Sequence, residues 1–189
     1  MALHFIDNRS VPSASGQTLP VIDPADGQTY DSIARGNAAD VDAAVQAARR
    51  CLDGAWSRLT AAERGRLLMK LSAAVAAHAD ELAAIEQRDC GKPTRQAKAD
   101  ALALVRYFEF YAGAGDKLHG HTIPYLDGYS VLTWHEPHGV TGHVIPWNYP
   151  MQIFGRSVGG ALAAGNVCVV KPSEDACLSL LRVAELAAE

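Results

Sequence analysis

The chain has 189 residues, of which 49% are hydrophobic and 20% are charged, and its formal net charge at pH 7 is −4. This composition is typical of a globular protein with a buried core, and without a basic cluster it gives no reason to expect nucleic acid or a membrane as a partner. The first residues lack the basic and apolar regions of a signal peptide, so we expect a cytoplasmic protein.

The first two-thirds of the chain are predicted to hold extended segments followed by helices. Residues 3–34 contain short apolar runs around the turn sequence Asp-Pro-Ala-Asp-Gly at 23–27. Beyond them, apolar residues recur at helical spacing. We expect four helices, which begin at Asp40 as N-cap, at a Thr60–Glu63 capping box, at Asp80 and at Thr94. The last of these is expected to face inward with six residues: Ala97, Ala101, Leu104, Val105, Phe108 and Tyr111.

From residue 118 onward the pattern changes to strands. Residues 118–138 are predicted to form a hairpin with an Asp127-Gly128 turn. A strand at 139–146, a helix at 150–164, a strand at 167–170 and a helix from Glu174 or Asp175 are expected next. This alternation predicts two parallel strands joined by a helix. Two strands do not complete such a sheet, so the chain is expected to contain only part of one.

Two short motifs follow these two strands. The first is Pro-Trp-Asn-Tyr-Pro at 146–150, and the second is Lys-Pro-Ser-Glu at 171–174. Ligands of open α/β sheets bind at the carboxyl ends of the strands. A buried carboxamide at Asn148 could donate a hydrogen bond to a developing oxyanion. Lys171 and Glu174 could bind ribose hydroxyls, and a carboxylate there disfavours a 2′-phosphate, which favours NAD over NADP.

Each motif also has a purely structural interpretation. Trp147 could fill the core, and Asn148 could do no more than satisfy backbone groups at the turn. Lys171 and Glu174 could be a solvated helix start, where a glutamate interacts favourably with the helix dipole. Both motifs at equivalent ends of adjacent strands favour the functional interpretation.

The segments VIPWNYP and GALAAGNVCVVKPSE closely resemble the NAD(P)-dependent aldehyde dehydrogenase superfamily, as do Asp-Cys-Gly-Lys-Pro at 89–93 and the hairpin that precedes Val140. The resemblance implies an α/β fold with N-terminal helices, an incomplete Rossmann-type sheet and a projecting hairpin. It divides the chain into strands and helices of the cofactor-binding domain at 1–117, an oligomerisation hairpin at 118–138 and the first βαβα unit of the NAD-binding domain at 139–189.

The same resemblance implies roles for individual residues. Asn148 matches the asparagine that stabilises the thiohemiacetal oxyanion. The cofactor cleft is matched by Ile145, Pro146, Trp147 and Asn148, and the adenosine ribose site by Lys171, Ser173 and Glu174. The family's nucleophilic cysteine and its glutamate base match nothing in residues 1–189. We therefore expect a chain that is inactive alone, within a homo-oligomeric enzyme that oxidises a small aldehyde to an acid with NAD, or with NADP.

Tyr149, Ile153 and Arg156 fall on one face of the predicted helix, the face that lines the aldehyde tunnel in members of this family. An arginine there resembles members that act on semialdehydes with a distal carboxylate, and Arg156-Ser157 resembles members that act on aromatic aldehydes. A guanidinium pairs well with a carboxylate. The alternative is that Arg156 pairs with an acidic side chain of the protein itself.

Histidines are frequent near the hairpin, but no cysteine or carboxylate accompanies them at ligand spacing, so we predict no metal site; they are His119, His121, His135, His138 and His143. The four cysteines form no C-x-x-C pair and are expected to be reduced and buried. The alternative function is a non-catalytic fragment that acts as an oligomerisation or interaction module.

Overall fold

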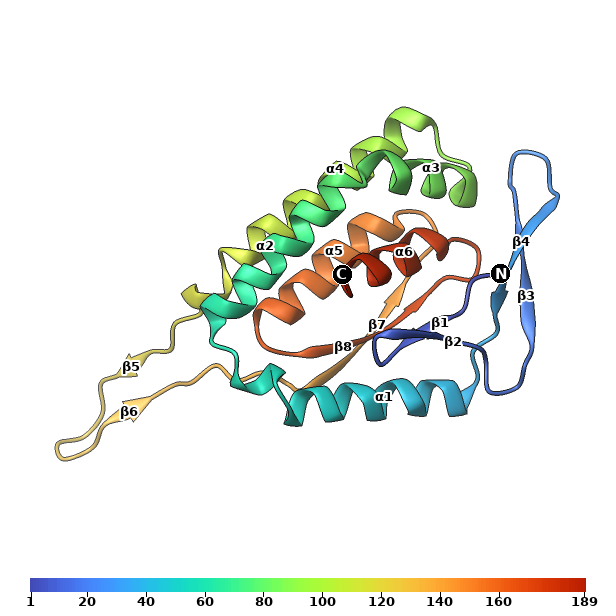
Figure 1. Ribbon diagram of the computed structural model, residues 1–189. Helices are drawn as coiled ribbons and strands as arrows, with labels where there is room; N and C mark the ends of the chain where they lie inside the picture. Colours follow the sequence, from blue (N-terminus) through green and yellow to red (C-terminus); the bar gives the residue numbers. More distant parts are fainter.

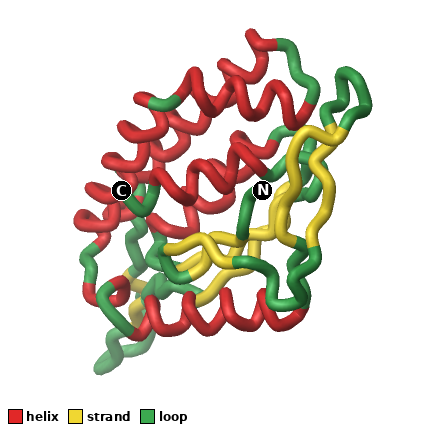
Figure 2. Tube along the Cα trace, turned by 45° about the vertical axis from the view of Figure 1, so that its right-hand side comes forward, coloured by secondary structure: helices red, strands yellow, loops and turns green.

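The computed structural model describes residues 1–189. Its centre is a parallel pair of strands, β7 (Val140–Ile145) and β8 (Val167–Pro172), with α1 (Ala38–Asp53) packed on one face. On the other face lie α5 (Pro150–Ala163) and α6 (Leu178–Leu186), and these are covered in turn by α2 (Ala61–Ala77), α3 (Ala79–Cys90) and α4 (Thr94–Ala112) (Figure 1). The same layers are visible after rotation (Figure 2).

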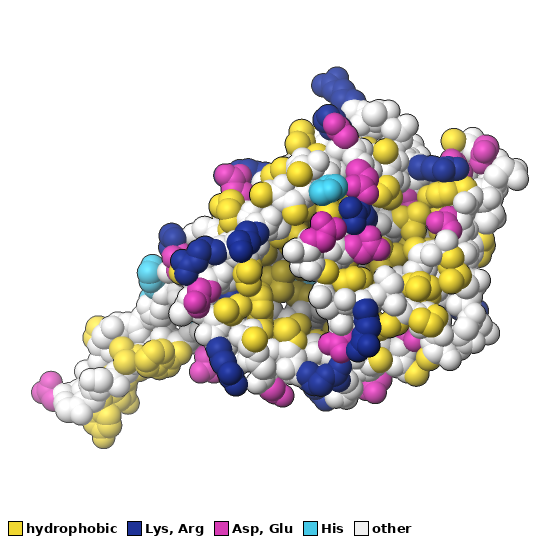
Figure 3. Space-filling view, viewed as in Figure 1, with side chains coloured by type: hydrophobic (Ala, Val, Ile, Leu, Met, Phe, Trp, Pro, Cys, Tyr) yellow, Lys and Arg dark blue, Asp and Glu magenta, His cyan; other side chains and the backbone are white.

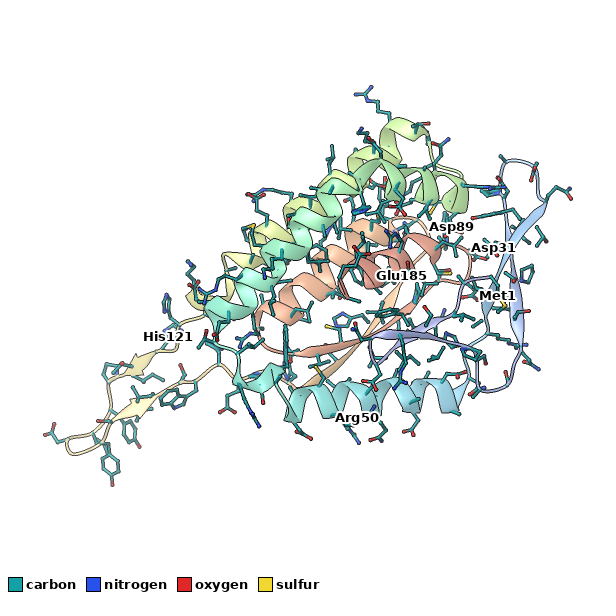
Figure 4. The ribbon with its side chains drawn as sticks, in the orientation of Figure 1. Met1, Asp31, Arg50, Asp89, His121 and Glu185 are labelled. Carbon is teal, nitrogen blue, oxygen red and sulfur yellow. The ribbon has the colours of Figure 1, made fainter.

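The N-terminal segment forms two antiparallel hairpins, as the extended pattern predicted. Strand β1 (His4–Ile6) pairs with β2 (Arg9–Val11), and β3 (Thr18–Ile22) pairs with β4 (Thr29–Ala34). The predicted 23–27 turn closes the second hairpin, because Gly27 has a φ of 72° and donates its N–H to the Asp23 carbonyl. The amino group of Met1 lies 2.7 Å from the Asp31 carboxylate, which ties the chain start to β4 (Figure 4).

The start of α1 differs from the prediction by one helical turn. Asn37 is the N-cap, and its side chain accepts the N–H groups of Ala39 and Asp40. Asp40 is the third helical residue, and its carboxylate accepts the N–H groups of Asn37 and Ala14. The prediction failed because both residue types favour N-cap positions, and the capping box between Asn37 and Asp40 was not recognised.

The other three predicted helices are confirmed as α2, α3 and α4. Thr60 and Glu63 form the expected capping box of α2, and Gly91 ends α3 in the left-handed conformation. Helix α3 begins at Ala79 after His78, one residue before the predicted start. The predicted inward face of α4 is confirmed for four residues that have no exposed surface: Ala97, Ala101, Leu104 and Phe108. Val105 and Tyr111 are only partly buried and pack against the same core. No helix is both long enough and apolar enough to cross a membrane.

Helices α4 and α5 pack closely because glycines line one side of α5. A β-carbon added at Gly155 would come within 2.8 Å of Leu104, and one added at Gly159 within 2.9 Å of Tyr111. Behind α5, Gly165 has a φ of 96° and reverses the chain into β8. Trp56 closes this turn by donating its indole N–H to the Gly165 carbonyl at 3.0 Å.

The hairpin of residues 118–138 is present but shorter than predicted. Its paired strands are β5 (Thr122–Ile123) and β6 (Val131–Leu132), and it projects away from the helices (Figure 1). The second half of the chain otherwise follows the prediction, since β7 and β8 are parallel and α5 joins them. Helix α6 begins at Leu178 rather than near Glu174, because residues 173–177 form a turn in which Ala176 donates to the Ser173 carbonyl.

Candidate functional site

The two motifs meet at one edge of the β7–β8 sheet. In the parallel register Val144 lies opposite Lys171 and Ile145 opposite Pro172. Beyond the last pair, Ser173 donates its backbone N–H to the Ile145 carbonyl at 2.8 Å. The carboxyl ends of both strands therefore lie side by side, and the motifs follow directly from them, which is where α/β sheets bind ligands.

Asn148 is exposed, which corrects the expectation of a buried carboxamide. Trp147 is 59% exposed, so it does not fill the core. Pro146 is also exposed, whereas the Ile145 side chain is only 2% exposed and packs into the main core. At this edge, then, Pro146, Trp147 and Asn148 present their side chains outward, and Ile145 anchors the strand from which they extend.

Lys171 and Glu174 form an exposed ion pair beside this edge. The Lys171 ammonium lies 2.9 Å from a Glu174 carboxylate oxygen, and both side chains are more than half exposed. The hydrogen bond from Lys171 lowers the pKa of Glu174, so its carboxylate stays ionised at neutral pH. Ser173, which lies between them in the sequence, is partly buried. The site thus offers an accessible donor and an accessible acceptor, the pair that two hydroxyls of a ribose require.

Tyr149, Ile153 and Arg156 lie together, as expected from their helical spacing, and they line one cavity. Gln96 and Gln152 complete its lining, and its volume is about 370 Å³. Arg156 donates to the Tyr107 hydroxyl at 2.9 Å and to the Gln152 side-chain oxygen at 2.7 Å. Both side-chain partners of Arg156 are uncharged, so the alternative that Arg156 pairs with a carboxylate of the protein is wrong.

The cysteines differ from the expectation that all four are buried. Cys177 is buried, Cys90 and Cys168 are partly buried, and Cys51 is exposed. Cys90 lies nearest the site, with its thiol 3.4 Å from the Trp147 carbonyl. Burial raises the pKa of Cys90 to about 12 and that of Cys168 to about 11, and it also raises that of Cys51.

Cys177 belongs to the same group, since burial raises its pKa to about 12. A nucleophilic cysteine reacts as its thiolate, which requires a pKa near or below neutral. All four thiols are therefore protonated at neutral pH. No group of three or more His, Cys, Asp or Glu side chains is arranged to hold a metal ion.

Sequence reasoning missed a buried ionic cluster formed by Glu86, Lys92 and Asp100. Lys92 donates to both carboxylates, and Glu86 and Asp100 are fully buried. A signal was present, because Glu86 follows Leu82 by four residues and Asp100 precedes Leu104 by four. Both acids thus fall on the apolar stripes of their helices, where a charge needs a partner.

These features define a class: an α/β protein with two motifs side by side at the carboxyl ends of parallel strands and a cavity lined by Tyr149, Ile153 and Arg156. Comparison with known proteins adds the family. Residues 11–189 match the Aldehyde dehydrogenase family. The chain belongs to this family, which confirms the resemblance and the expected fold class.

Individual relatives agree. The chain is 44% identical over 184 residues to a mitochondrial benzaldehyde dehydrogenase of Antirrhinum majus, covering 96% of this chain and 34% of that protein. A crystal structure of a Burkholderia cenocepacia protein assigned as an aldehyde dehydrogenase matches with a TM-score of 0.97 and 67% identity, over 99% of this chain and 40% of that one. The structure of a Bacillus cereus aldehyde dehydrogenase in complex with NAD⁺ matches with a TM-score of 0.96 and 39% sequence identity, covering 99% of this chain and 38% of that one. The chain thus spans between a third and two fifths of these relatives.

Proposed function

We propose that the chain supplies the oxyanion donor and part of the cofactor cleft of an enzyme that oxidises an aldehyde to a carboxylic acid. The observation that carries this proposal is the meeting of the two motifs at one sheet edge, where Asn148 is exposed and Ser173 bonds to Ile145. A structural turn alone would not need an accessible carboxamide beside an accessible Lys171–Glu174 pair.

In the proposed reaction a thiolate adds to the aldehyde carbon, and the carbonyl oxygen becomes an oxyanion. The Asn148 side-chain N–H donates to this oxygen, and because an amide carries no charge to titrate, it does so over a wide pH range. The thiolate and the base that activates water are proposed to come from outside residues 1–189, because the family's nucleophilic cysteine and glutamate base match nothing here and burial raises the pKa of the thiols that are present. The 189-residue chain alone is therefore inactive.

Lys171, Ser173 and Glu174 are proposed to hold the ribose of the cofactor, and Pro146 and Trp147 to line its cleft. NAD⁺, when bound, supplies the hydride acceptor. Lys171 donates to one hydroxyl, and the ionised Glu174 accepts from another. A negative carboxylate at that position repels a 2′-phosphate, which favours NAD over NADP.

The proposed substrate is an aromatic aldehyde or a semialdehyde with a distal carboxylate. Arg156 uses two of its donors on Tyr107 and Gln152, and its remaining guanidinium N–H groups are available at the cavity lined by Tyr149 and Ile153. A guanidinium binds a carboxylate or stacks on an aromatic ring. A relative named benzaldehyde dehydrogenase is consistent with the aromatic choice.

A chimera tests the proposal. Residues 1–189 replace the matching segment of the Burkholderia cenocepacia relative, with which they share 67% identity. We expect NADH formation from benzaldehyde by the chimera and none from the 189-residue chain. Asn148→Ala should lower kcat about 10²–10³-fold, the usual cost of one lost oxyanion donor. An Asn148→Ala chimera with the parent's kcat would refute the proposed role.

A second candidate function is an interaction module, and the hairpin favours it. Large apolar side chains gather on this projection (Figure 3). Trp134 is 79% exposed, and Tyr125, Leu126 and Tyr129 are each more than 60% exposed. Exposed apolar patches of this kind mark contacts with another chain. Such a contact also fits a homo-oligomer, and sedimentation of the chain over a range of concentrations tests it.

A further inference from the structure

The buried cluster of Glu86, Lys92 and Asp100 lies beneath the first turn of α5. The Lys92 ammonium donates to Glu86 Oε1 at 2.7 Å and to Asp100 Oδ2 at 2.5 Å. Both carboxylate side chains are fully buried, and the lysine side chain is 11% exposed. A buried charge without a partner is strongly disfavoured, so Lys92 is what allows both carboxylates to stay in place.

Glu86 acts as the cap of α5. Its second oxygen accepts the backbone N–H of Met151 at 3.3 Å and the Ser179 hydroxyl at 3.4 Å. Helix α5 has no side-chain cap of its own at Tyr149, and Pro150 has no N–H. The free N–H at the start of α5 is therefore satisfied from α3, and the helix start that follows Asn148 is held at a fixed place.

Asp100 connects the cluster to Gln152 and Arg156 on α5. Its second oxygen accepts the Gln152 side-chain N–H at 2.6 Å, and the Gln152 side-chain oxygen accepts from Arg156 at 2.7 Å. The amide of Gln152 is thus oriented from both sides. Lys92 also lies 4.5 Å from the centre of the Tyr149 ring, within reach of a cation–π interaction. Lys92 is thus connected through Glu86 to the helix start that follows Asn148, and through Asp100 and Gln152 to Arg156.

We propose that Lys92 is a positioning residue. Held between Glu86 and Asp100, it fixes the first turn of α5 and thereby sets the side chains of Asn148 and Arg156 against the aldehyde. This inference rests on the proposed function. Lys92 itself touches neither the aldehyde nor the cofactor and acts through the two carboxylates.

The test compares Lys92→Met with Lys92→Arg and with a control, Lys98→Met, which removes an exposed lysine of the same region that pairs with Asp80. In the chimera, kcat of Lys92→Met should fall about 10-fold or more, because a small misplacement of reacting groups is costly. The KM for NAD⁺ should change less than twofold, since the Lys171–Glu174 pair lies outside the cluster. Lys92→Arg, which keeps the charge, should recover most of kcat, and Lys98→Met should match the parent.

Hydrogen exchange in the 189-residue chain gives a readout that does not need activity. The Met151 amide should exchange faster in Lys92→Met than in the parent or in Lys98→Met, because the Glu86 acceptor is displaced. An unchanged kcat together with unchanged protection of Met151 would overturn the proposal. Should the chimera with native Lys92 be inactive, the proposed function fails, and the exchange at Met151 alone decides the positioning role.

If Lys92→Met does not fold, Gln152→Leu keeps both bonds from Lys92 to Glu86 and Asp100 and removes the link from Asp100 through Gln152 to Arg156. It should raise the KM for 4-carboxybenzaldehyde about fivefold and leave the KM for acetaldehyde and for NAD⁺ unchanged. Equal effects on both aldehydes would contradict the link.

Discussion

Glu86→Gln should change how the stability of the chain depends on pH. Burial raises the pKa of Glu86 from 4.5 to about 7, with a further upward contribution from Asp100 and an opposing one from Lys92. Between these pH values the folded chain keeps a proton that the unfolded chain has released. Stability from this group is therefore fully present below about pH 4.5 and is lost as pH rises through about 7. The difference corresponds to about 3 kcal/mol of unfolding free energy.

The assay is urea unfolding of the chain at pH 5 and pH 8, followed by circular dichroism. The loss of unfolding free energy between the two pH values should be about 2–3 kcal/mol smaller in Glu86→Gln than in the parent, because glutamine cannot titrate and pH 5 already lies above the unfolded pKa. Glu109→Gln, at an exposed glutamate paired with Arg106, is the control and should follow the parent. An identical pH dependence in Glu86→Gln and the parent would refute the reasoning.

Two further predictions concern packing and specificity. Gly65→Ala should destabilise the chain by about 1–2 kcal/mol, because the added β-carbon would lie 2.3 Å from the Ala112 carbonyl oxygen. Gly113→Ala is the control and should be close to neutral, since its β-carbon would meet nothing nearer than 3.7 Å. Thermal melts of both variants test this difference in stability. Arg156→Ala in the chimera should lower kcat/KM for an aromatic or acidic aldehyde about tenfold or more and leave acetaldehyde unchanged, so equal losses would remove the proposed specificity.

The sequence was sufficient for the elements whose signals are local. The buried face of α4, the Thr60–Glu63 box and the parallel β7–β8 pair all follow from spacing or from short-range caps. The meeting of the two motifs at one sheet edge follows in turn from the strand–helix–strand order, because parallel strands place their carboxyl ends together.

Contacts between distant segments account for most of what was missed. Helix α6 begins at Leu178 because Asp89, at the end of α3, accepts the Leu178 N–H at 2.9 Å (Figure 4). A capping group 89 positions earlier has no local signature. Arg156 was assigned to the right face, but its partners Tyr107 and Gln152 depend on how α4 packs on α5. Residue types alone do not specify that packing.

The turn at Gly165 has a consequence for how the chain folds during synthesis. Trp56 donates to the Gly165 carbonyl 109 positions later, and Arg64 donates to the Ala163 carbonyl 99 positions later. At about 5–20 residues per second, the acceptors leave the ribosome roughly 5–20 s after their donors. The Trp56 indole and the Arg64 guanidinium are therefore synthesised first, and they lack these two carbonyl acceptors until Ala163 and Gly165 emerge. The β7–α5–β8 unit is therefore synthesised after the segments that hold its Gly165 turn, and these two hydrogen bonds form only once it has emerged.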